Sequence, residues 1–415
     1  MKRRDFVKLA GMGAVVASTG LPIKARAQGQ SQTPPSDRIG FGVIGPGSRG
    51  QEDMRQFLRM PGVEVRAVCD VYEPRFDAVR RITNNPNIPT YRDYRQLLDR
   101  KDLDFVVVAT PPHLHAEIEI AALQSGRHVY GEKVLAFTVE QCHNLVKTVA
   151  QTGKIFQVGY QYRYDRVYTE AIRRIKAGEI GRVSHVFSYW HRNNNWRRPV
   201  PDPKFERLIN WRMYKESSLG LMAELGSHHL NIINWLFDAV PESVVGSGGI
   251  DTYRDGRETN DNVQAIFRYP GGRTYTFSSF LDNAKIGHQL NIYGDKGTVE
   301  ITPDSTYFYY EPAKSAPPDT GETVVDRGAR TSATQSSKGD LPYRGPGTQL
   351  KLAEGENIAP NTIAMRSFIE SLRNNKRPLT DVQAGRDSAI GILLANKAID
   401  EGRRIHFAEY LGKKE

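Results

Sequence analysis

The sequence predicts an α/β protein in which a doubly wound parallel sheet is followed by an α+β domain with a large, mostly antiparallel open sheet. Two observations predict this fold class. Between residues 38 and 160, short continuous apolar runs alternate with helical periodicity, which is typical of parallel strands covered by helices on both faces. Beyond residue 160, most apolar segments are strand-like and are separated by turns rich in Gly and Pro, which is typical of an antiparallel sheet.

The length and composition exclude several classes of protein. The chain has 415 residues, of which 39% are hydrophobic and 25% charged, and this composition is typical of a folded globular protein. At about one domain per ~150 residues, the length predicts two or three domains. Two cysteines are too few for a disulfide scaffold, and no Cys/His cluster suggests a metal site. No apolar run reaches the ~20 residues that a membrane span needs.

Residues 1–27 have the three parts of an export signal. A basic start that contains Arg3 and Arg4 precedes a mild apolar stretch, and a small-residue cleavage site ends at Ala27. The paired arginines resemble a twin-arginine signal, which exports proteins that are already folded. We expect cleavage after Ala27, a polar linker over residues 28–37 and a periplasmic mature protein. The alternative is a short amphipathic helix on a cytoplasmic protein.

Much of the basic excess belongs to that signal. The full chain has a formal net charge of +10, but without residues 1–27 it carries 51 basic and 46 acidic side chains, a net charge of +5. No dense basic stripe remains, so we do not expect a nucleic acid partner. Cys69 and Cys142 fall in segments predicted to be a buried strand and a helix. We therefore expect two packed free thiols, although a periplasmic location would permit a disulfide.

The first domain is predicted over residues 38–160. Each of its strands is a short apolar run, and each of its helices has apolar residues at helical spacing. The strands are predicted at residues 39–44, 63–68, 105–109, 128–130 and 156–159, and the helices at 51–60, 76–84, 91–98, 116–125 and 139–151.

The second domain is predicted over residues 161–358 and begins with a helix over residues 169–177. Residues 311–357 are rich in Ser, Thr, Pro and Gly and are predicted to form a long loop. Residues 359–415 are predicted to pack back on the core through helices at 362–374 and 382–401. The strands of this domain are predicted at residues 183–190, 243–248, 263–269, 274–280, 289–293 and 298–301.

A glycine-rich turn joins the first predicted strand to the first predicted helix. Gly45, Gly47 and Gly50 form the pattern G-x-G-x-x-G, and Asp70 stands at the end of the next strand, 20 residues past Gly50. In a Rossmann domain such glycines allow a tight turn and the approach of a pyrophosphate, and the carboxylate binds the adenosine ribose. We therefore expect a bound dinucleotide; the alternative is a glycine turn without a nucleotide. Asp70 would repel a 2′-phosphate and favours NAD, although Arg75 leaves NADP open.

Four further motifs, in this order, resemble the glucose–fructose oxidoreductase / inositol dehydrogenase / MocA family. They are Val108-Ala-Thr-Pro-Pro-His-Leu-His115, His128-Val-Tyr-Gly-Glu-Lys133, Val158-Gly-Tyr-Gln-Tyr-Arg-Tyr164 and Glu224-Leu-Gly-Ser-His228. Together with the glycine fingerprint and the turn at residues 294–297, the resemblance covers nearly all of residues 39–405. It implies an NAD(P)-dependent enzyme but says much less about the substrate, because the family is broad.

The resemblance implies three catalytic residues, Lys133, Glu224 and His228. To oxidise a sugar hydroxyl, a base removes its proton while hydride leaves for the nicotinamide, and a cation holds the oxygen whose charge changes. His228 suits the base and Lys133 the cation. The spacing of four residues predicts that Glu224 lies one helical turn from His228, able to orient it or share its proton. The alternatives are that Lys133 and Glu224 are surface charges and that His229 is the reacting histidine.

Three positions depart from the family pattern. Val134 stands where proline is usual, which predicts a less rigid loop around Lys133. Glu224 replaces the commoner aspartate, and Asn231 stands where a further acid is often found. The implied chemistry survives these changes, but proton transfer and the choice of hydroxyl need not be typical of the family.

Further residues are expected to line the cofactor and substrate sites. His113 and His115 are expected to shape the nicotinamide pocket and to cap the next helix, and Gln161 falls where a side-chain amide meets the nicotinamide in such enzymes.

Residues 189–214 interleave three tryptophans with arginines and amides. This composition suits the binding of a carbohydrate; the alternative is an aromatic surface buried at a subunit contact. The predicted cofactor ligands are Gly45, Gly47, Ser48, Arg49, Gly50, Asp70, Arg75, Thr110, Pro111, His113, His115, Glu132, Lys133 and Gln161. The predicted substrate ligands are Arg163, Tyr164, His191, Trp211, Arg212 and His229.

These observations predict an exported NAD(P)-dependent oxidoreductase that acts on a hydroxyl of a sugar or glycoside. Because no soluble cofactor pool is expected in the periplasm, the cofactor is predicted to stay tightly bound and to be recycled by a second substrate. The alternative is a redox-neutral NAD-dependent hydrolase similar to glycoside hydrolase family 109, although Lys133 favours the dehydrogenase because, by resemblance, those hydrolases lack it. A remote alternative is a non-catalytic sugar-binding protein. The resemblance also implies a homodimer or homotetramer formed through the open sheet.

Overall fold

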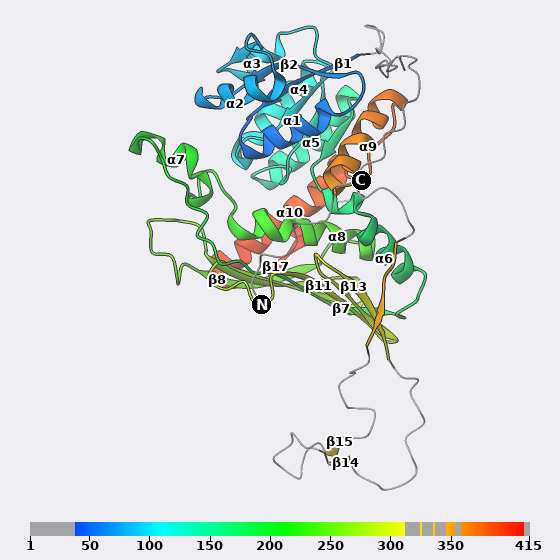
Figure 1. Cartoon of the computed structure of the whole chain (residues 1–415). Coiled ribbons are helices and arrows are strands. Elements are labelled where there is room, and N and C mark those ends of the chain that lie inside the picture. The colour runs from blue at the N-terminus through cyan, green and yellow to red at the C-terminus, as the bar shows by residue number, and fades with distance from the viewer. Residues whose placement is uncertain (1–37, 312–323, 326–334, 337–345, 353–357, 411–415) are drawn as a thin grey trace, which may run out of the picture.

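The structure is a computed structural model that describes residues 38–311, 324–325, 335–336, 346–352 and 358–410. The predicted signal and linker, and most of the predicted loop at residues 311–357, lie outside these described residues. Figure 1 shows an N-terminal domain stacked on a layer of helices, which in turn lies on one face of a large second sheet.

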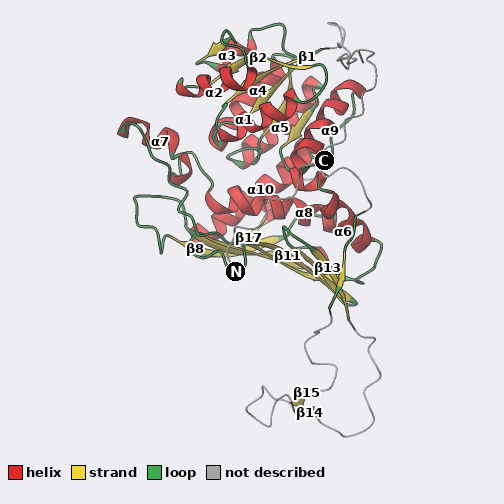
Figure 2. Cartoon of the chain, in the orientation of Figure 1, coloured by secondary structure: helices red, strands yellow, loops and turns green. Residues whose placement is uncertain are grey.

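The N-terminal domain contains a six-stranded parallel sheet with the order β3-β2-β1-β4-β5-β6, and helices cover both of its faces (Figure 2). This confirms the predicted doubly wound domain, but the short strand β3 was not predicted, and the helix expected over residues 91–98 begins only at Tyr94. The order of the strands reverses between β1 and β4, and sheets of this kind bind ligands at the carboxyl ends of the strands at such a point. The elements are β1 Ile39–Ile44, α1 Ser48–Leu58, β2 Val63–Cys69, α2 Pro74–Thr83, β3 Thr90–Tyr91, α3 Tyr94–Leu98, β4 Phe105–Val108, α4 His115–Gln124, β5 His128–Gly131, α5 Val139–Thr152 and β6 Phe156–Val158.

The second domain is built on a nine-stranded sheet with the order β16-β13-β12-β11-β7-β10-β9-β8-β17. Its strands pair antiparallel except β7 and β10, which are parallel, so the predicted mostly antiparallel sheet is confirmed. The strands β13, β16 and β17 were not predicted. The elements are α6 Arg166–Lys176, β7 Val183–Trp190, α7 Glu206–Ile209, α8 Ser227–Phe237, β8 Ser243–Gly249, β9 Asn262–Arg268, β10 Thr274–Phe280, β11 His288–Gly294, β12 Gly297–Ile301, β13 Thr306–Tyr310, β14 Val324–Val325, β15 Gln335–Ser336, β16 Thr348–Gln349, α9 Pro360–Asn374, α10 Val382–Glu401 and β17 Ile405–His406.

This sheet has one covered and one open face. Along β10 the buried residues Tyr275 and Phe277 alternate with partly exposed ones, as expected where one face is packed and the other meets solvent. The helices α6, α8 and α10 lie on the packed face (Figure 1). On the opposite face, Ile266 is 47% exposed.

The two C-terminal helices tie the domains together. Phe368 of α9 packs against Phe57, Phe105 and Tyr130 of the N-terminal domain, with ring centroids 5.1–6.1 Å apart. The helix α10 contacts α5 of the first domain and α8 and β8 of the second.

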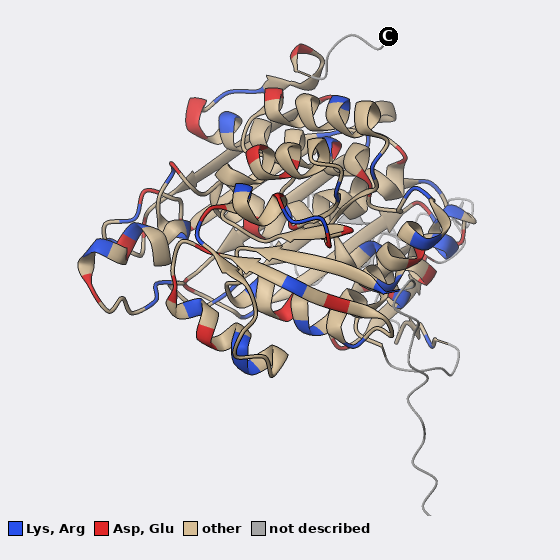
Figure 3. Cartoon of the chain, turned by 90° about the horizontal axis from the view of Figure 1, so that it is seen from above, with Lys and Arg blue, Asp and Glu red and all other residues tan. Residues whose placement is uncertain are grey.

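Lys and Arg are interspersed with Asp and Glu over the elements of both domains (Figure 3).

Cys69 and Cys142 are buried free thiols, which confirms the expectation of two packed thiols. Among the described helices, none combines the length and the apolar character of a membrane-spanning segment.

We expect that replacing Phe368 with Ala lowers the free energy of unfolding by about 3–5 kcal/mol, because it leaves a cavity in an aromatic cluster that joins α9 to the first domain. Chemical denaturation followed by circular dichroism measures this change. Leu379, which is 48% exposed, provides the control, and Leu379→Ala should change the value by no more than about 0.5 kcal/mol. Equal effects of the two substitutions would contradict the packing role of Phe368.

Candidate active site

The turn between β1 and α1 has the geometry of a dinucleotide-binding loop. Gly45 has a φ of +85°, and a Cβ there would lie 2.9 Å from the backbone of Ala109. A Cβ on Gly50 would lie 2.4 Å from the carbonyl oxygen of Gly45, so a larger residue would separate the helix from the strand. A Cβ on Gly47 would meet only the side chain of Arg75, at 3.7 Å. The turn therefore leaves space for a phosphate at the N-terminus of α1.

Asp70 stands directly after β2, at the position that binds the adenosine ribose in such domains. Its Oδ1 accepts a hydrogen bond of 2.8 Å from the backbone N–H of Tyr72. Its Oδ2 lies 2.7 Å from Nη1 of Arg75. The predicted ligands Asp70 and Arg75 thus form an ion pair beside the glycine turn.

Arg49, in the first turn of α1, pairs with carboxylates. Its Nε lies 2.8 Å from Oε1 of Glu132 and 3.0 Å from Oδ1 of Asp53. The structure therefore brings the predicted cofactor ligands Arg49 and Glu132 into contact with each other, which anchors the residue before Lys133 to the nucleotide turn. Ser48, another predicted ligand, accepts a hydrogen bond of 3.3 Å from Nη1 of Arg198 in the second domain.

His115 connects two loops at the carboxyl edge of the sheet and is almost completely buried. Its Nε2 and Nδ1 each lie 2.8 Å from a carbonyl oxygen, those of Thr110 and Val134 respectively. Burial lowers the pKa of His115, and a neutral imidazole donates to only one of these oxygens at a time. The prediction that His115 is a cofactor ligand is therefore corrected, since both ring nitrogens are turned to the backbone of Thr110 and Val134.

Other predicted ligands lie at the same edge. Pro111 follows β4, and Gln161 follows β6 at the start of a short 3₁₀ turn. Thr110 Oγ1 and His113 Nδ1 are buried and lack a hydrogen-bond partner among the described residues. These two polar groups are therefore available to a bound cofactor.

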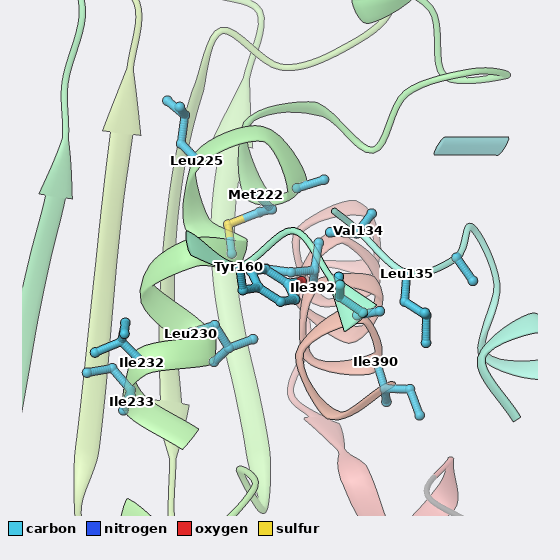
Figure 4. Packing of buried hydrophobic residues seen from close by; sticks show 14 of the residues in the cluster. Val134, Leu135, Tyr160, Met222, Leu225, Leu230, Ile232, Ile233, Ile390 and Ile392 are labelled. Carbon is cyan, nitrogen blue, oxygen red and sulfur yellow. The ribbon is translucent and has the colours of Figure 1, made fainter. Parts of the chain in front are cut away.

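The loop that carries Lys133 is fixed by hydrophobic packing. The peptide bond between Lys133 and Val134 is cis. Val134 is buried and belongs to the same core cluster as Tyr160, Met222 and Ile392, and Figure 4 shows these side chains gathered between α8 and α10. The packing anchors the loop in the absence of the usual proline. Lys133 can therefore reach across the domain boundary in a defined direction.

Lys133 meets Glu224 of the second domain. Its Nζ donates a hydrogen bond of 3.1 Å to the carbonyl oxygen of Glu224 and lies 3.8 Å from its Oε1. Arg212 completes the group, because its Nε donates to Oε2 of Glu224 at 2.8 Å. Burial alone would raise the pKa of Glu224, but the charges of Arg212 and Lys133 prevail and lower it to about 2. Burial lowers the pKa of Lys133, and Glu224 opposes this shift.

The expected contact between Glu224 and His228 is corrected by the structure. Glu224 lies in a π-helical turn, Met222–Gly226, that precedes α8. Its carboxylate turns toward Lys133 and Arg212, and among the described residues no hydrogen bond joins it to His228. The two cations, and the wider turn of the π-helix, explain the difference from a regular helical spacing.

His228 lies in an aromatic enclosure at the start of α8. Its ring centroid is 5.2 Å from that of Tyr162, 5.8 Å from that of Trp190 and 6.0 Å from that of Tyr160. Its Nδ1 is buried and lacks a hydrogen-bond partner among the described residues. Burial, assisted by the charge of Lys133, lowers the pKa of His228 well below its ordinary value. The imidazole is therefore neutral near pH 7 and able to accept a proton.

His229 faces the sheet instead. Its Nε2 lies 2.8 Å from Nε2 of His288, and the two rings are stacked. The charge of Lys133 helps to lower the pKa of His228. The contact of His229 with His288 therefore leaves His228 as the better candidate for the base. In the described part of the chain, no group of three His, Cys, Asp or Glu side chains could hold a metal ion.

The structure adds residues that sequence reasoning did not assign to the site. Tyr162 and His288 surround His228 together with Trp190, with Tyr162 and His288 centroids 5.6 Å apart. The guanidinium of Arg192 lies 5.6 Å from the ring centroid of Trp190 and 5.9 Å from that of Trp196. Tyr162 lies in the junction motif and Arg192 in the aromatic segment, so both were within regions that the sequence indicated.

Three predicted substrate ligands lie away from this group. His191 stacks on Phe280 with centroids 3.7 Å apart and contacts Ser278, which places it on the open face of the sheet. Arg163 lies over Trp235. Tyr164 is buried, and its hydroxyl lies 3.3 Å from Oγ1 of Thr380. By contrast, Arg212 contacts Glu224, and its guanidinium stacks on the predicted ligand Trp211 at 4.2 Å.

Two family models match the chain. The model described as "Oxidoreductase family, NAD-binding Rossmann fold" matches residues 39–160. The model of the "GFO/IDH/MocA C-terminal domain" matches residues 168–300. Among curated proteins, "Glycosyl hydrolase family 109 protein 1" of Shewanella sp. (strain MR-4) is 32% identical over 235 residues, which is 51% of this chain and 50% of that protein. The chain thus spans about half the length of this relative.

Solved structures share the fold across both domains. The aldose-aldose oxidoreductase from Caulobacter crescentus complexed with glycerol has a TM-score of 0.69 at 20% identity, covering 89% of this chain and 99% of the other. The WlbA dehydrogenase from Bordetella pertussis, in complex with NADH and UDP-GlcNAcA, has a TM-score of 0.66 at 20% identity, covering 89% and 98%. The myo-inositol 2-dehydrogenase from Lactobacillus plantarum has a TM-score of 0.67 at 18% identity, covering 89% and 99%.

Replacing Glu224 with Gln removes the negative charge that opposes the effect of burial on Lys133. We expect the pKa of Lys133 to fall further, because its ammonium group loses its partner. Carbon-13 NMR of protein labelled at lysine Cε measures this titration, with the signal assigned from Lys133→Arg. Glu216, an exposed residue that pairs with Arg207, provides Glu216→Gln as the control. An unchanged titration of Lys133 in Glu224→Gln would contradict the electrostatic role of Glu224.

Proposed function

The chain belongs to the GFO/IDH/MocA family of NAD-binding oxidoreductases, and we propose on this premise that it transfers hydride between nicotinamide and a hydroxyl-bearing carbon of a sugar or glycoside. The observation that carries the proposal is the contact of buried Lys133 with Glu224 next to the neutral His228. This contact lies at the carboxyl edge of the parallel sheet, where ligands of such domains bind.

The residues of the site suit alcohol oxidation. When nicotinamide is bound, it accepts the hydride that the substrate carbon loses. His228 takes the hydroxyl proton, because its imidazole is uncharged near neutral pH. Lys133 holds the oxygen on which negative charge develops, and Glu224 opposes the lowering of the lysine pKa by burial. Arg212 in turn keeps Glu224 ionised, so the carboxylate positions and charges Lys133 and does not take up the proton.

The surroundings of His228 support a carbohydrate substrate. Tyr162, Trp190 and His288 present ring surfaces, and sugar C–H faces pack well on aromatic rings. Arg192, above Trp190 and Trp196, supplies hydrogen-bond donors for hydroxyl groups. Such a combination of apolar walls and a few placed polar groups is typical of small-molecule sites.

We infer that NAD is preferred to NADP. The carboxylate of Asp70 lies where the adenosine ribose is bound in such domains, and its charge would repel a 2′-phosphate. Arg75 is already paired with Asp70, which lowers its availability for that phosphate. The cofactor, by this proposal, stays bound between catalytic cycles.

A redox-neutral glycoside hydrolase is the second candidate, and the curated relatives named glycosyl hydrolase family 109 favour it. In that reaction, oxidation at C3 acidifies the C2 proton, and loss of this proton expels the aglycone from C1. Water then adds at C1, and the hydride returns to C3. His228 and Lys133 suit the oxidation and reduction steps of either reaction, so the geometry of these two residues does not separate the candidates.

Two further features of the protein are proposed. The twin-arginine pattern at Arg3 and Arg4 supports export of the folded protein to the periplasm, with cleavage after Ala27. The open face of the second sheet, with exposed Ile266 and Tyr293, supports a homodimer or homotetramer formed through that face.

Replacing Asp70 with Ser should shift the cofactor preference toward NADP. The substitution removes a repulsive charge and frees Arg75 for a 2′-phosphate, so we expect the ratio of NADPH to NADH affinity to rise about 10-fold or more. Nicotinamide fluorescence titration measures both affinities. Asp77→Ser, which removes a mostly exposed carboxylate of α2, is the control. An unchanged ratio would contradict the assigned role of Asp70.

The reaction itself is tested by incubating the mature protein with NAD and a panel of nitrophenyl glycosides while nitrophenol and reduced nicotinamide are followed together. Reduced nicotinamide formed in proportion to the sugar consumed establishes the dehydrogenase. Nitrophenol released without net reduction establishes the hydrolase and overturns the first candidate. His228→Asn should lower kcat about 10²–10⁴-fold in either case, whereas His185→Asn, on the exposed outer side of β7, should not.

A further inference from the structure

A segment of the second domain reaches the nucleotide turn of the first. Residues 191–214, here called the clasp, leave the sheet after β7 and include α7, which rises toward α2 in Figure 1. Phe205 of the clasp packs edge-on against Tyr72, with ring centroids 5.1 Å apart. Arg198 donates a hydrogen bond of 3.3 Å from Nη1 to Oγ of Ser48, the first residue of α1. The clasp therefore touches the first domain at both Tyr72 and Ser48.

Arg198 is held in place by Asn210, which is almost completely buried. The backbone N–H of Arg198 donates to Oδ1 of Asn210 at 2.7 Å, and Nδ2 of Asn210 donates to the carbonyl oxygen of Arg198 at 2.9 Å. The same Nδ2 also donates to Glu206 at 3.0 Å. These reciprocal bonds fix the backbone of Arg198 although its side chain is exposed.

The clasp is also tied to the rest of its own domain. Arg197 pairs with Glu206 within the clasp and, at 3.1 Å, with Asp255 on a neighbouring loop. The hydroxyl of Tyr214 donates to Glu206 at 2.9 Å. These ion pairs and the hydrogen bond hold the clasp in a fixed position relative to the rest of the second domain.

Positive charge gathers at the point where the clasp meets the nucleotide turn. Among the described residues, no carboxylate lies within 4 Å of the Arg198 guanidinium. The partial burial of Arg198 lowers its pKa, and the charges of Arg212 and Arg75 add to this effect. Arg75 and Arg212 are already paired with Asp70 and Glu224. Among the described cations at this place, Arg198 is therefore the one without a carboxylate partner, and it lies against Ser48 at the N-terminus of α1, where an anion would be stabilised.

We propose that Arg198 binds the pyrophosphate of the dinucleotide from the second domain, so that the clasp closes over the bound cofactor and slows its release. The inference rests on the proposed function only in its choice of a dinucleotide as ligand. The pyrophosphate supplies the anion that Arg198 lacks, and the contact between Phe205 and Tyr72 closes the clasp beside the adenosine end, next to Asp70.

The test compares cofactor release in the wild-type protein, Arg198→Gln and Arg207→Gln. Arg207 belongs to the same clasp but pairs with Glu216 and Glu258 on its exposed side, so its substitution removes the same charge at a different place. Each protein is stripped of cofactor and loaded with NADH, and release into excess NAD is followed by nicotinamide fluorescence. We expect release about 10-fold faster or more from Arg198→Gln, the effect of losing a charge-assisted hydrogen bond, and a rate near that of wild type from Arg207→Gln.

A second measurement places the contact on the phosphates. Arg198→Gln should weaken the binding of ADP-ribose by a similar factor and leave the binding of adenosine, which has no phosphate, unchanged. Arg198→Lys should recover part of the affinity for ADP-ribose. Equal weakening of ADP-ribose and adenosine binding would overturn the proposal, because it would show a general change of the site.

The outcomes separate this proposal from the proposed function. If wild-type protein binds NADH and Arg198→Gln releases it as slowly as Arg207→Gln does, the clasp proposal is wrong and the oxidoreductase proposal stands. If wild-type protein binds neither NADH nor ADP-ribose, both proposals are wrong. Phe205→Ala, which removes the contact with Tyr72 but leaves Arg198, is expected to speed NADH release by a smaller factor.

Discussion

A buried lysine keeps its charge only with a partner, and the partner of Lys133 comes from the other domain. Removing a cation from water costs several kcal/mol unless an anion compensates it. Glu224 supplies that anion, and Arg212 keeps Glu224 ionised. On the other side of Lys133, Glu132 pairs with Arg49 at the start of α1. A line of charges therefore runs from Arg49 at the glycine turn through Glu132 and Lys133 to Glu224 and Arg212 of the second domain, and the ion pair of Lys133 depends on the docking of both domains.

The fold could be predicted where local pattern decides it. Continuous apolar runs between helical segments indicated the parallel sheet, and the strands β7 and β10 were predicted with the bounds that the structure shows. The strands β16 and β17 have only two residues each. They are extended because they pair with β13 and β8, and a segment of two residues is too short to show a strand pattern in the sequence. The strand β13 was missed because its tyrosine-rich sequence continues directly into a segment with loop composition.

The site could be predicted in its residues but less well in its contacts. Lys133, Glu224 and His228 were found from their motifs, and the structure brings Lys133 to Glu224. The four-residue spacing indicated a pair with His228 because it assumed a regular helix, whereas a π-helical turn and two cations set the direction of Glu224. His191 was misplaced because neighbouring residues of an extended chain point to opposite faces. Trp190 faces His228, so His191 faces Phe280 on the open side.

An enzyme that holds its cofactor has to undo each reduction before the next cycle begins. A dehydrogenase of this kind needs a second substrate that takes the hydride back, and a redox-neutral hydrolase returns it to the same sugar. In either proposed reaction the base acts in both directions, and His228 would accept a proton during oxidation and donate it during reduction. The ion pairs of Glu224 with Arg212 and Lys133 suit this cycle, because the pKa of Glu224 is lowered to about 2 and its carboxylate stays ionised while His228 gains and loses a proton.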